Sequence, residues 1–260
     1  MVFYFCVQFP YLIYQYYCKL EISVRNGKEN IMRSLIKFVI KMVPVVAIAI
    51  AVMGIVHTWS ADHEKNEEAA VYEKQAEEIM ISSNNTEIIG NADMEETYEY
   101  PAMDLSMYSD LEDFVGVIYI PAADILYPIM SGEEYSRLDI NRESSKCGSI
   151  YTLDDFDINA KHNFIFGHNM ANGSMFGNLK ETFLDGQNIG TLVYLYTMDD
   201  VHCYKVTNTE VRQAGEIATS YGESDSRSIT LYTCYGMAGQ KGKHAKKLLV
   251  NATEVFCTNY

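Results

Sequence analysis

The stretch SITLYTCYG, from Ser228 to Gly236, decides how this chain is expected to fold and where its chemistry is expected to lie. Apolar and polar residues alternate through it with a period of two, which is typical of a half-buried strand. Gly236 ends the pattern, so the sequence predicts Cys234 at the end of a strand, beside a loop that a substrate can reach. A packed core cysteine is the alternative, and it is the commoner role. A second stretch upstream favours the first interpretation.

That second stretch is HNFIFGHNMANGSMFGNLKETF, residues 162–183. A predicted strand at 163–166 runs into a glycine, and His168 follows it on a loop, before a short helical pattern at 175–183. A lone histidine is more often structural. A cysteine at one strand end and a histidine at another, however, is the arrangement that nucleophilic cysteine catalysis requires. We therefore expect Cys234 and His168 to act together.

Four motifs carry a resemblance to a known family. The strings GHNM and GSMFGNL within 167–179, together with TLYTC at 230–234, resemble the sortase family, and the spacing GHNM-x-x-GSMFG-x-L is most like class B. The stretches DFVGVIYIPAADILYPIM, 113–130, and KCGSIYTLDDF, 146–156, extend the similarity in the family's order. Class B relatives usually carry a helix-bearing insertion before the cysteine strand, whereas only about 16 residues, 212–227, precede it here.

The resemblance implies a cysteine transpeptidase of the Gram-positive cell surface. In such an enzyme Cys234 attacks a peptide bond in the C-terminal sorting motif of a surface protein, a thioester forms, and a cell-wall amine resolves it. An unperturbed thiol has a pKa of about 8.5 and is mostly protonated at neutral pH, so this nucleophile needs a cationic neighbour. His168 can be that cation and can then protonate the leaving amine. Thr233, Asn169 and Tyr232 are expected to contact the substrate.

A third sortase residue is an arginine on the strand after the cysteine, and no arginine follows Arg227 in this chain. Aligning KLLVNATEV on the family's last strand puts Lys247 at that position, with Lys243 and Lys246 as neighbours that a shifted alignment would select. Arg227 has the wrong strand parity to replace it. A lysine keeps the charge but loses the planar fork of the guanidinium. The alternative is that these lysines form a solvated loop.

Eight short β runs predict a mainly β domain. Their number and spacing favour a closed antiparallel barrel or a sandwich, and the resemblance implies an eight-stranded sortase-type barrel with short helices. The predicted strands are 115–120, 125–130, 149–153, 163–166, 191–197, 203–211, 228–234 and 248–255.

Composition limits the partners. A formal net charge of −15 argues against nucleic acid, which requires a basic surface. The six cysteines have no CxxC spacing, so neither a zinc nor a disulfide framework is expected. His202 and Cys203 are adjacent and would point to opposite faces of a strand, which argues against a metal site shared by these two. We expect no cofactor.

The N-terminal part predicts a membrane anchor. Residues 1–31 have no regular period, and we hypothesise that translation begins at Met32; an interfacial segment rich in tyrosine is the alternative. The sequence predicts a signal anchor at residues 32–58, because Arg33, Lys37 and Lys41 precede the apolar run 42–56. A cleaved signal peptide is the alternative. Either way, the body is exported.

Residues 59–107 are acidic and predict a linker or stalk, in part a solvated helix, and the catalytic domain is expected over 108–260. The expected protein is thus a single-pass protein of the cell membrane with its catalytic domain outside. Its partners would be surface proteins with sorting signals, a peptidoglycan-precursor amine and the membrane. Two other functions stay open: an exported cysteine peptidase that hydrolyses peptides, and a sortase-like binding module with weakened chemistry.

Overall fold

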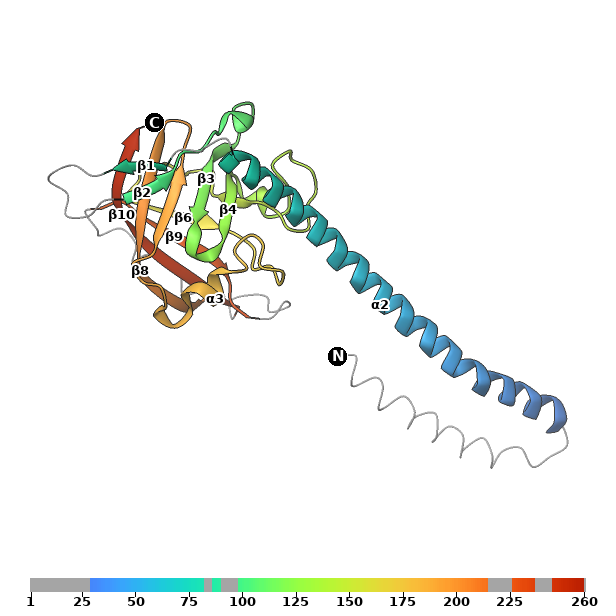
Figure 1. The fold of residues 1–260 in the computed structure, drawn as a ribbon. Coiled ribbons are helices and arrows are strands. Elements are labelled where there is room, and N and C mark those ends of the chain that lie inside the picture. Colours follow the sequence, from blue (N-terminus) through green and yellow to red (C-terminus); the bar gives the residue numbers. More distant parts are fainter. Residues whose placement is uncertain (1–28, 82–85, 90–97, 215–225, 237–244, 260) are drawn as a thin grey trace. The chain divides into compact units, whose positions relative to one another are not determined.

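The computed structural model describes residues 29–81, 86–89, 98–214, 226–236 and 245–259 (Figure 1). Residues 1–31, which precede the hypothesised start at Met32, lie almost wholly outside these ranges. The chain divides into two compact units, with the boundary between Ala61 and Asp62.

The first unit contains the start of helix α2, Glu29–Ile81. Between Ile36 and Met80 this helix has a stretch that is long and apolar enough to cross a membrane. Its large apolar side chains from Phe38 to Trp59 are exposed, an arrangement that is unfavourable in water and suits lipid. The predicted anchor, 32–58, falls within this helix.

In the second unit the end of α2 packs on the domain that follows it. Ala69, Tyr72 and Ile79 are buried, with spacings of three and seven residues that place them on one side of the helix. The Tyr72 hydroxyl lies 3.2 Å from Ser149 Oγ, and the Glu68 carboxylate accepts hydrogen bonds from backbone N–H groups at 146 and 147. This part of the expected stalk therefore belongs to the same compact unit as the barrel. The domain boundary near 108 stays a prediction.

The centre of the second unit is a closed barrel of eight strands in the order β10-β8-β7-β3-β4-β5-β6-β9. The strands are β3 Phe114–Ile120, β4 Ile125–Ser131, β5 Ile150–Thr152, β6 His162–Phe166, β7 Leu192–Tyr196, β8 Asp200–Gln213, β9 Ser228–Cys234 and β10 Lys246–Asn259. A two-stranded sheet pairs β1, Thr86–Ile89, with β2, Tyr98–Pro101. The short helices are η1 Ser106–Tyr108, η2 Pro121–Ala123, η3 Glu133–Ser136, α3 Leu179–Phe183 and η4 Leu184–Gly186.

The eight-stranded barrel with short helices is confirmed, with one correction. β4 pairs with β5, and β6 with β9, in parallel, so the expectation of a purely antiparallel barrel is wrong. Parallel neighbours need long crossover connections, and the segment between β4 and β5 is one of these. The helix predicted at 175–183 is also shorter in the structure, where only α3 is α-helical. Met175 has φ 53° and forms a β-bridge with Asn169, so the helix cannot begin there.

The core explains why the strand ends are fixed in place. Side chains from all parts of the barrel are fully buried in it, among them Val117, Ile129, Ile165, Leu195, Leu231 and Val250. Burying one such side chain contributes about 1.5–3 kcal/mol. On β9, Leu231 and Thr233 are buried, whereas Tyr232 is half-buried and Cys234 is exposed. The strand thus presents its cysteine on the outer face.

Candidate active site

Cys234 is the last residue of β9, and Lys247 on β10 is its cross-strand partner. Side chains directly opposite each other in an antiparallel pair lie on one face of the sheet, close enough to touch. The Lys247 ammonium donates a hydrogen bond to Cys234 Sγ over 3.0 Å. The contact places a positive charge beside the sulfur, and the thiolate is the nucleophilic form of cysteine.

His168 reaches the same edge of the barrel through the parallel pairing of β6 with β9. Phe166 is the register partner of Tyr232, so His168 and Cys234 each stand two residues beyond that pair. The pairing continues past the strand, because the backbone N–H of Gly167 donates to the Tyr232 carbonyl over 3.1 Å. His168 and Cys234 therefore follow adjacent strand ends in the same direction.

The His168 ring is oriented by a backbone group. Its Nε2 lies 2.7 Å from the Ser136 carbonyl, which can only accept, so Nε2 carries a proton. In the neutral ring this leaves the lone pair on Nδ1 for proton exchange.

Thr233 and Asn169 connect the two strand ends. Thr233 is buried, and its hydroxyl donates to the Gly167 carbonyl over 2.8 Å. The side-chain amide of Asn169 donates to the Cys234 carbonyl over 2.8 Å. Both residues thus hold the histidine loop against the cysteine strand. That they also contact substrate stays a prediction.

An aromatic surface adjoins the thiol. The Tyr232 and Phe166 rings lie 5.1 Å apart between centroids, and Phe166 stacks on Tyr151 at 5.3 Å. The Lys247 ammonium also lies 5.3 Å from the Tyr232 ring centroid. Burial, with the nearby Cys234 and Tyr151, raises the pKa of Tyr232 to about 12, so its hydroxyl stays protonated at neutral pH. Tyr232, predicted as a substrate residue, therefore offers an apolar ring and a neutral hydroxyl.

Arg212 was not predicted near the site, because the family resemblance places the arginine on the strand after the cysteine. In the structure Arg212 on β8 is the other cross-strand partner of Lys247, so the order across the sheet is Arg212, Lys247, Cys234. Its guanidinium forms an ion pair with Glu210 over 2.7 Å. No sequence pattern indicated this neighbour, because it depends on the register between strands that are far apart in the chain.

The other cations considered lie elsewhere. Lys246 has the opposite strand parity to Lys247 and is exposed, and Lys243 lies outside the described residues. Arg227 donates from Nε to Glu254 over 2.6 Å at the beginning of β9, far from Cys234 at its end. Among the candidates that the structure describes, Lys247 is the one in contact with the thiol.

Two other cysteines are unsuited to nucleophilic chemistry. Cys147 is buried, and burial together with Glu68 raises the pKa of its thiol to about 11. Burial likewise raises the pKa of Cys203 to about 12. Both thiols are therefore protonated at neutral pH.

The fold and this site define a closed-barrel protein with an exposed thiol beside a cation and a histidine at the neighbouring strand end. A family model described as the sortase domain matches residues 118–255, more than half of the chain. The chain belongs to the sortase family.

Solved structures agree with this fold. Sortase B of Bacillus anthracis in complex with AAEK1 is 18% identical, with a TM-score of 0.54, and the match covers 74% of this chain and 98% of that one. A Staphylococcus aureus sortase B–substrate complex is 16% identical, with a TM-score of 0.53 and coverage of 74% and 98%. Both neighbours are sortases B, which is consistent with the class B motifs. The curated proteins contain no match.

Proposed function

We propose that this protein is a membrane-anchored cysteine transpeptidase that cleaves a C-terminal sorting motif of surface proteins and transfers them to a cell-wall amine. The observation that carries this proposal is the 3.0 Å contact between Cys234 Sγ and the Lys247 ammonium, at the exposed end of a barrel strand in a sortase-family chain. The proposal assigns the nucleophile to Cys234, proton transfer to His168 and charge stabilisation to Lys247.

The first half-reaction breaks a peptide bond. The Cys234 thiolate attacks the carbonyl carbon, and negative charge moves from sulfur to the carbonyl oxygen. Lys247 can stabilise the charge in both positions, because an ammonium in contact with the sulfur is also near the oxyanion that replaces it. His168 gives a proton to the leaving amine as the C–N bond breaks, and a thioester on Cys234 remains.

The second half-reaction reverses these roles. The acceptor amine attacks the thioester carbonyl, its proton passes to His168, and the C–S bond breaks as the new amide forms. Cys234 leaves as the thiolate beside Lys247. Hydrolysis would follow the same steps with water in place of the amine, so the acceptor distinguishes a transpeptidase from a peptidase.

Arg212 offers a further cation on the same face of the sheet, but its charge is compensated by Glu210. Within the described part of the chain Lys247 forms no ion pair with a carboxylate, and its ammonium contacts the sulfur directly, so we assign it the role of the family arginine.

The anchor is proposed from the exposed apolar side chains of α2 and the basic residues before them. Arg33, Lys37 and Lys41 on the N-terminal side favour a cytoplasmic N-terminus and an external barrel. This location would bring the site to surface proteins and peptidoglycan precursors.

Product analysis tests the proposal against its two alternatives. The full chain is incubated with peptides that carry C-terminal sorting motifs, with and without an added amine, and the products are identified by mass spectrometry. We expect an amide to the added amine. Free carboxylic acid alone would indicate a peptidase, and unchanged peptide would indicate a binding module.

A further inference from the structure

A second group of reactive side chains lies between the beginning of β8 and the end of β10. Asp200 and His202 are two residues apart on β8 and so share a face of the sheet. Cys257 on β10 is the cross-strand partner of His202. One ligand atom from each of the three residues lies within 4.8 Å of the other two. Carboxylate, imidazole and thiolate are the three protein ligands of zinc.

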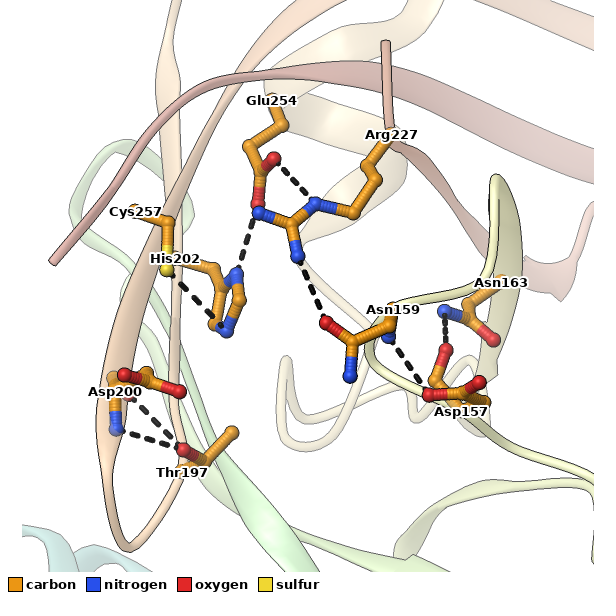
Figure 2. A network of polar contacts seen from close by, with 9 residues as sticks. All are labelled: Asp157, Asn159, Asn163, Thr197, Asp200, His202, Arg227, Glu254 and Cys257. Carbon is orange, nitrogen blue, oxygen red and sulfur yellow. Dashed lines mark hydrogen bonds and ion pairs between the residues drawn. The ribbon is translucent and has the colours of Figure 1, made fainter. Parts of the chain in front are cut away.

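A β-bulge assembles the surroundings of His202. The register of β10 against β8 shifts between Glu254 and Phe256, which inserts one extra residue. In a regular strand Glu254 and Cys257 would point to opposite faces, because they are three residues apart. The bulge turns both toward His202, as Figure 2 shows.

Glu254 selects the tautomer of the neutral His202 ring. His202 is buried, and its Nδ1 lies 2.8 Å from a Glu254 carboxylate oxygen, which accepts the ring N–H. In the neutral ring the lone pair is then on Nε2, which lies 3.8 Å from Cys257 Sγ (Figure 2). A histidine that ligates a metal commonly donates its other N–H to a carboxylate in this way.

Glu254 is itself held in place. Arg227 donates from Nε to the second carboxylate oxygen of Glu254 over 2.6 Å and from Nη1 to Asn159 over 3.2 Å. The guanidinium compensates the charge of Glu254, so this carboxylate serves to orient His202, and Asp200 is left as the anionic oxygen ligand.

The separation between the sulfur of Cys257 and Nε2 of His202 fits a tetrahedral ion. With Zn–S near 2.3 Å and Zn–N near 2.0–2.1 Å, tetrahedral geometry separates sulfur and nitrogen by about 3.6 Å. The observed separation is 3.8 Å. A bound dication deprotonates a thiol that coordinates it.

We propose that Asp200, His202 through Nε2, and Cys257 bind a divalent transition-metal ion of the zinc class, with water as the fourth ligand. Binding releases the thiol proton of Cys257 to solvent. The ion links the beginning of β8 to the end of β10. Lys247, beside the proposed nucleophile, lies near the other end of β10, roughly 30 Å along the strand. The ion therefore stabilises the barrel and takes no part in the peptide chemistry.

Cobalt spectroscopy on the full chain in detergent tests this site. The metal-free protein is titrated with Co²⁺, and we expect one ion per chain with a thiolate-to-cobalt charge-transfer band. Cys257→Ser should abolish the band, whereas Cys234→Ala should retain it. Glu254→Gln should weaken binding by about 10- to 100-fold, because the orienting carboxylate is lost.

Thermal unfolding gives a second readout. Zinc at 100 times its Kd should raise the Tm of the wild-type chain by roughly 5–10 °C, and this rise should be absent in Cys257→Ser. Cys257 is exposed, so its replacement spares the core, unlike that of the buried His202. Absence of a band in the wild type, an unchanged band in Cys257→Ser, or loss of the band in Cys234→Ala would each overturn the proposal.

Discussion

Lys247 lies directly across the β9–β10 pair from Cys234, with its ammonium nitrogen 3.0 Å from the cysteine sulfur. A shift of one residue in this pairing would turn every side chain of β10 to the other face and remove the contact. The buried residues that follow, Leu248 to Val250, hold the register. The packing of the barrel thus fixes the electrostatics of the thiol.

We predict that Lys247 stabilises the oxyanion in place of the family arginine. Lys247→Ala should lower the rate of acylation on the order of 10²-fold, a typical cost of removing one donor to an oxyanion. Lys246→Ala is the matched control, because its side chain has the opposite parity, and it should change the rate little. Lys247→Arg should keep or raise activity if the guanidinium fork binds two acceptors. Equal, small losses in both alanine variants would show that Lys247 has no special role.

Replacement of the thiols separates the proposed nucleophile from the buried cysteines. Cys234→Ala should abolish thioester formation, while Cys147→Ala and Cys203→Ala should keep the rate within a few-fold, because their raised pKa values leave them protonated. Peptide cleavage assays on the three variants measure this. Full activity in Cys234→Ala would exclude it as the nucleophile.

His168→Ala should lower acylation by roughly 10²- to 10⁴-fold, the usual contribution of a general acid or base. His162→Gln is a matched control from the beginning of the same strand, where the ring bonds to Ser228 and Thr230. The acylation rate of this control variant should stay within a few-fold of the wild-type rate in a peptide cleavage assay. Similar losses in both variants would point to a structural role for His168.

Burial lowers the pKa of His162, which makes the stability of the domain depend on pH. The unfolded chain takes up a proton near pH 6.5, whereas the folded chain does so only at lower pH. Between these values the unfolded state binds more protons, so stability falls as the pH falls, and above pH 6.5 this histidine has no effect. Urea unfolding at pH 7.5 and pH 5 should show a smaller loss for His162→Gln than for the wild type. An equal loss would exclude His162 as the cause.

The packing of the α2 end should contribute to the stability of the barrel. Tyr72 is buried against Tyr127 and lies within hydrogen-bonding distance of Ser149. Tyr72→Ala should therefore cost about 3–5 kcal/mol of unfolding free energy, as is typical when a buried aromatic ring is removed. Lys74→Ala, on the exposed side of the helix, should cost less than about 0.5 kcal/mol. Denaturant unfolding measures both. Equal stabilities would mean that this helix does not support the domain.

The sequence was sufficient for local structure. Strand β9 was predicted with its observed bounds, because alternation with a period of two is a local signal that ends at a glycine. The packing of Ala69 and Tyr72 against the rest of the second unit was not predicted, because an acidic helix with few apolar residues has only a weak hydrophobic period. These few apolar residues nevertheless form the buried side of the helix.

Relationships between strands were the part that sequence could not supply. The position of Arg212 beside Lys247 depends on the β8–β10 register, and the approach of Glu254 and Cys257 to His202 depends on a bulge. Cysteine spacing indicated no metal framework, because ligands contributed by separate strands leave no short motif. Only the folded sheet brings these residues together.

Intact-mass spectrometry of the full chain mixed with a sorting-motif peptide tests the central claim most directly. We predict a covalent adduct with the mass of the acyl fragment on Cys234, and its discharge on addition of an amine with formation of an equal amount of the amide. An enzyme that remains at its unmodified mass, or an adduct that is discharged only to the free acid when the amine is present, would contradict the assignment of transpeptidation to Cys234.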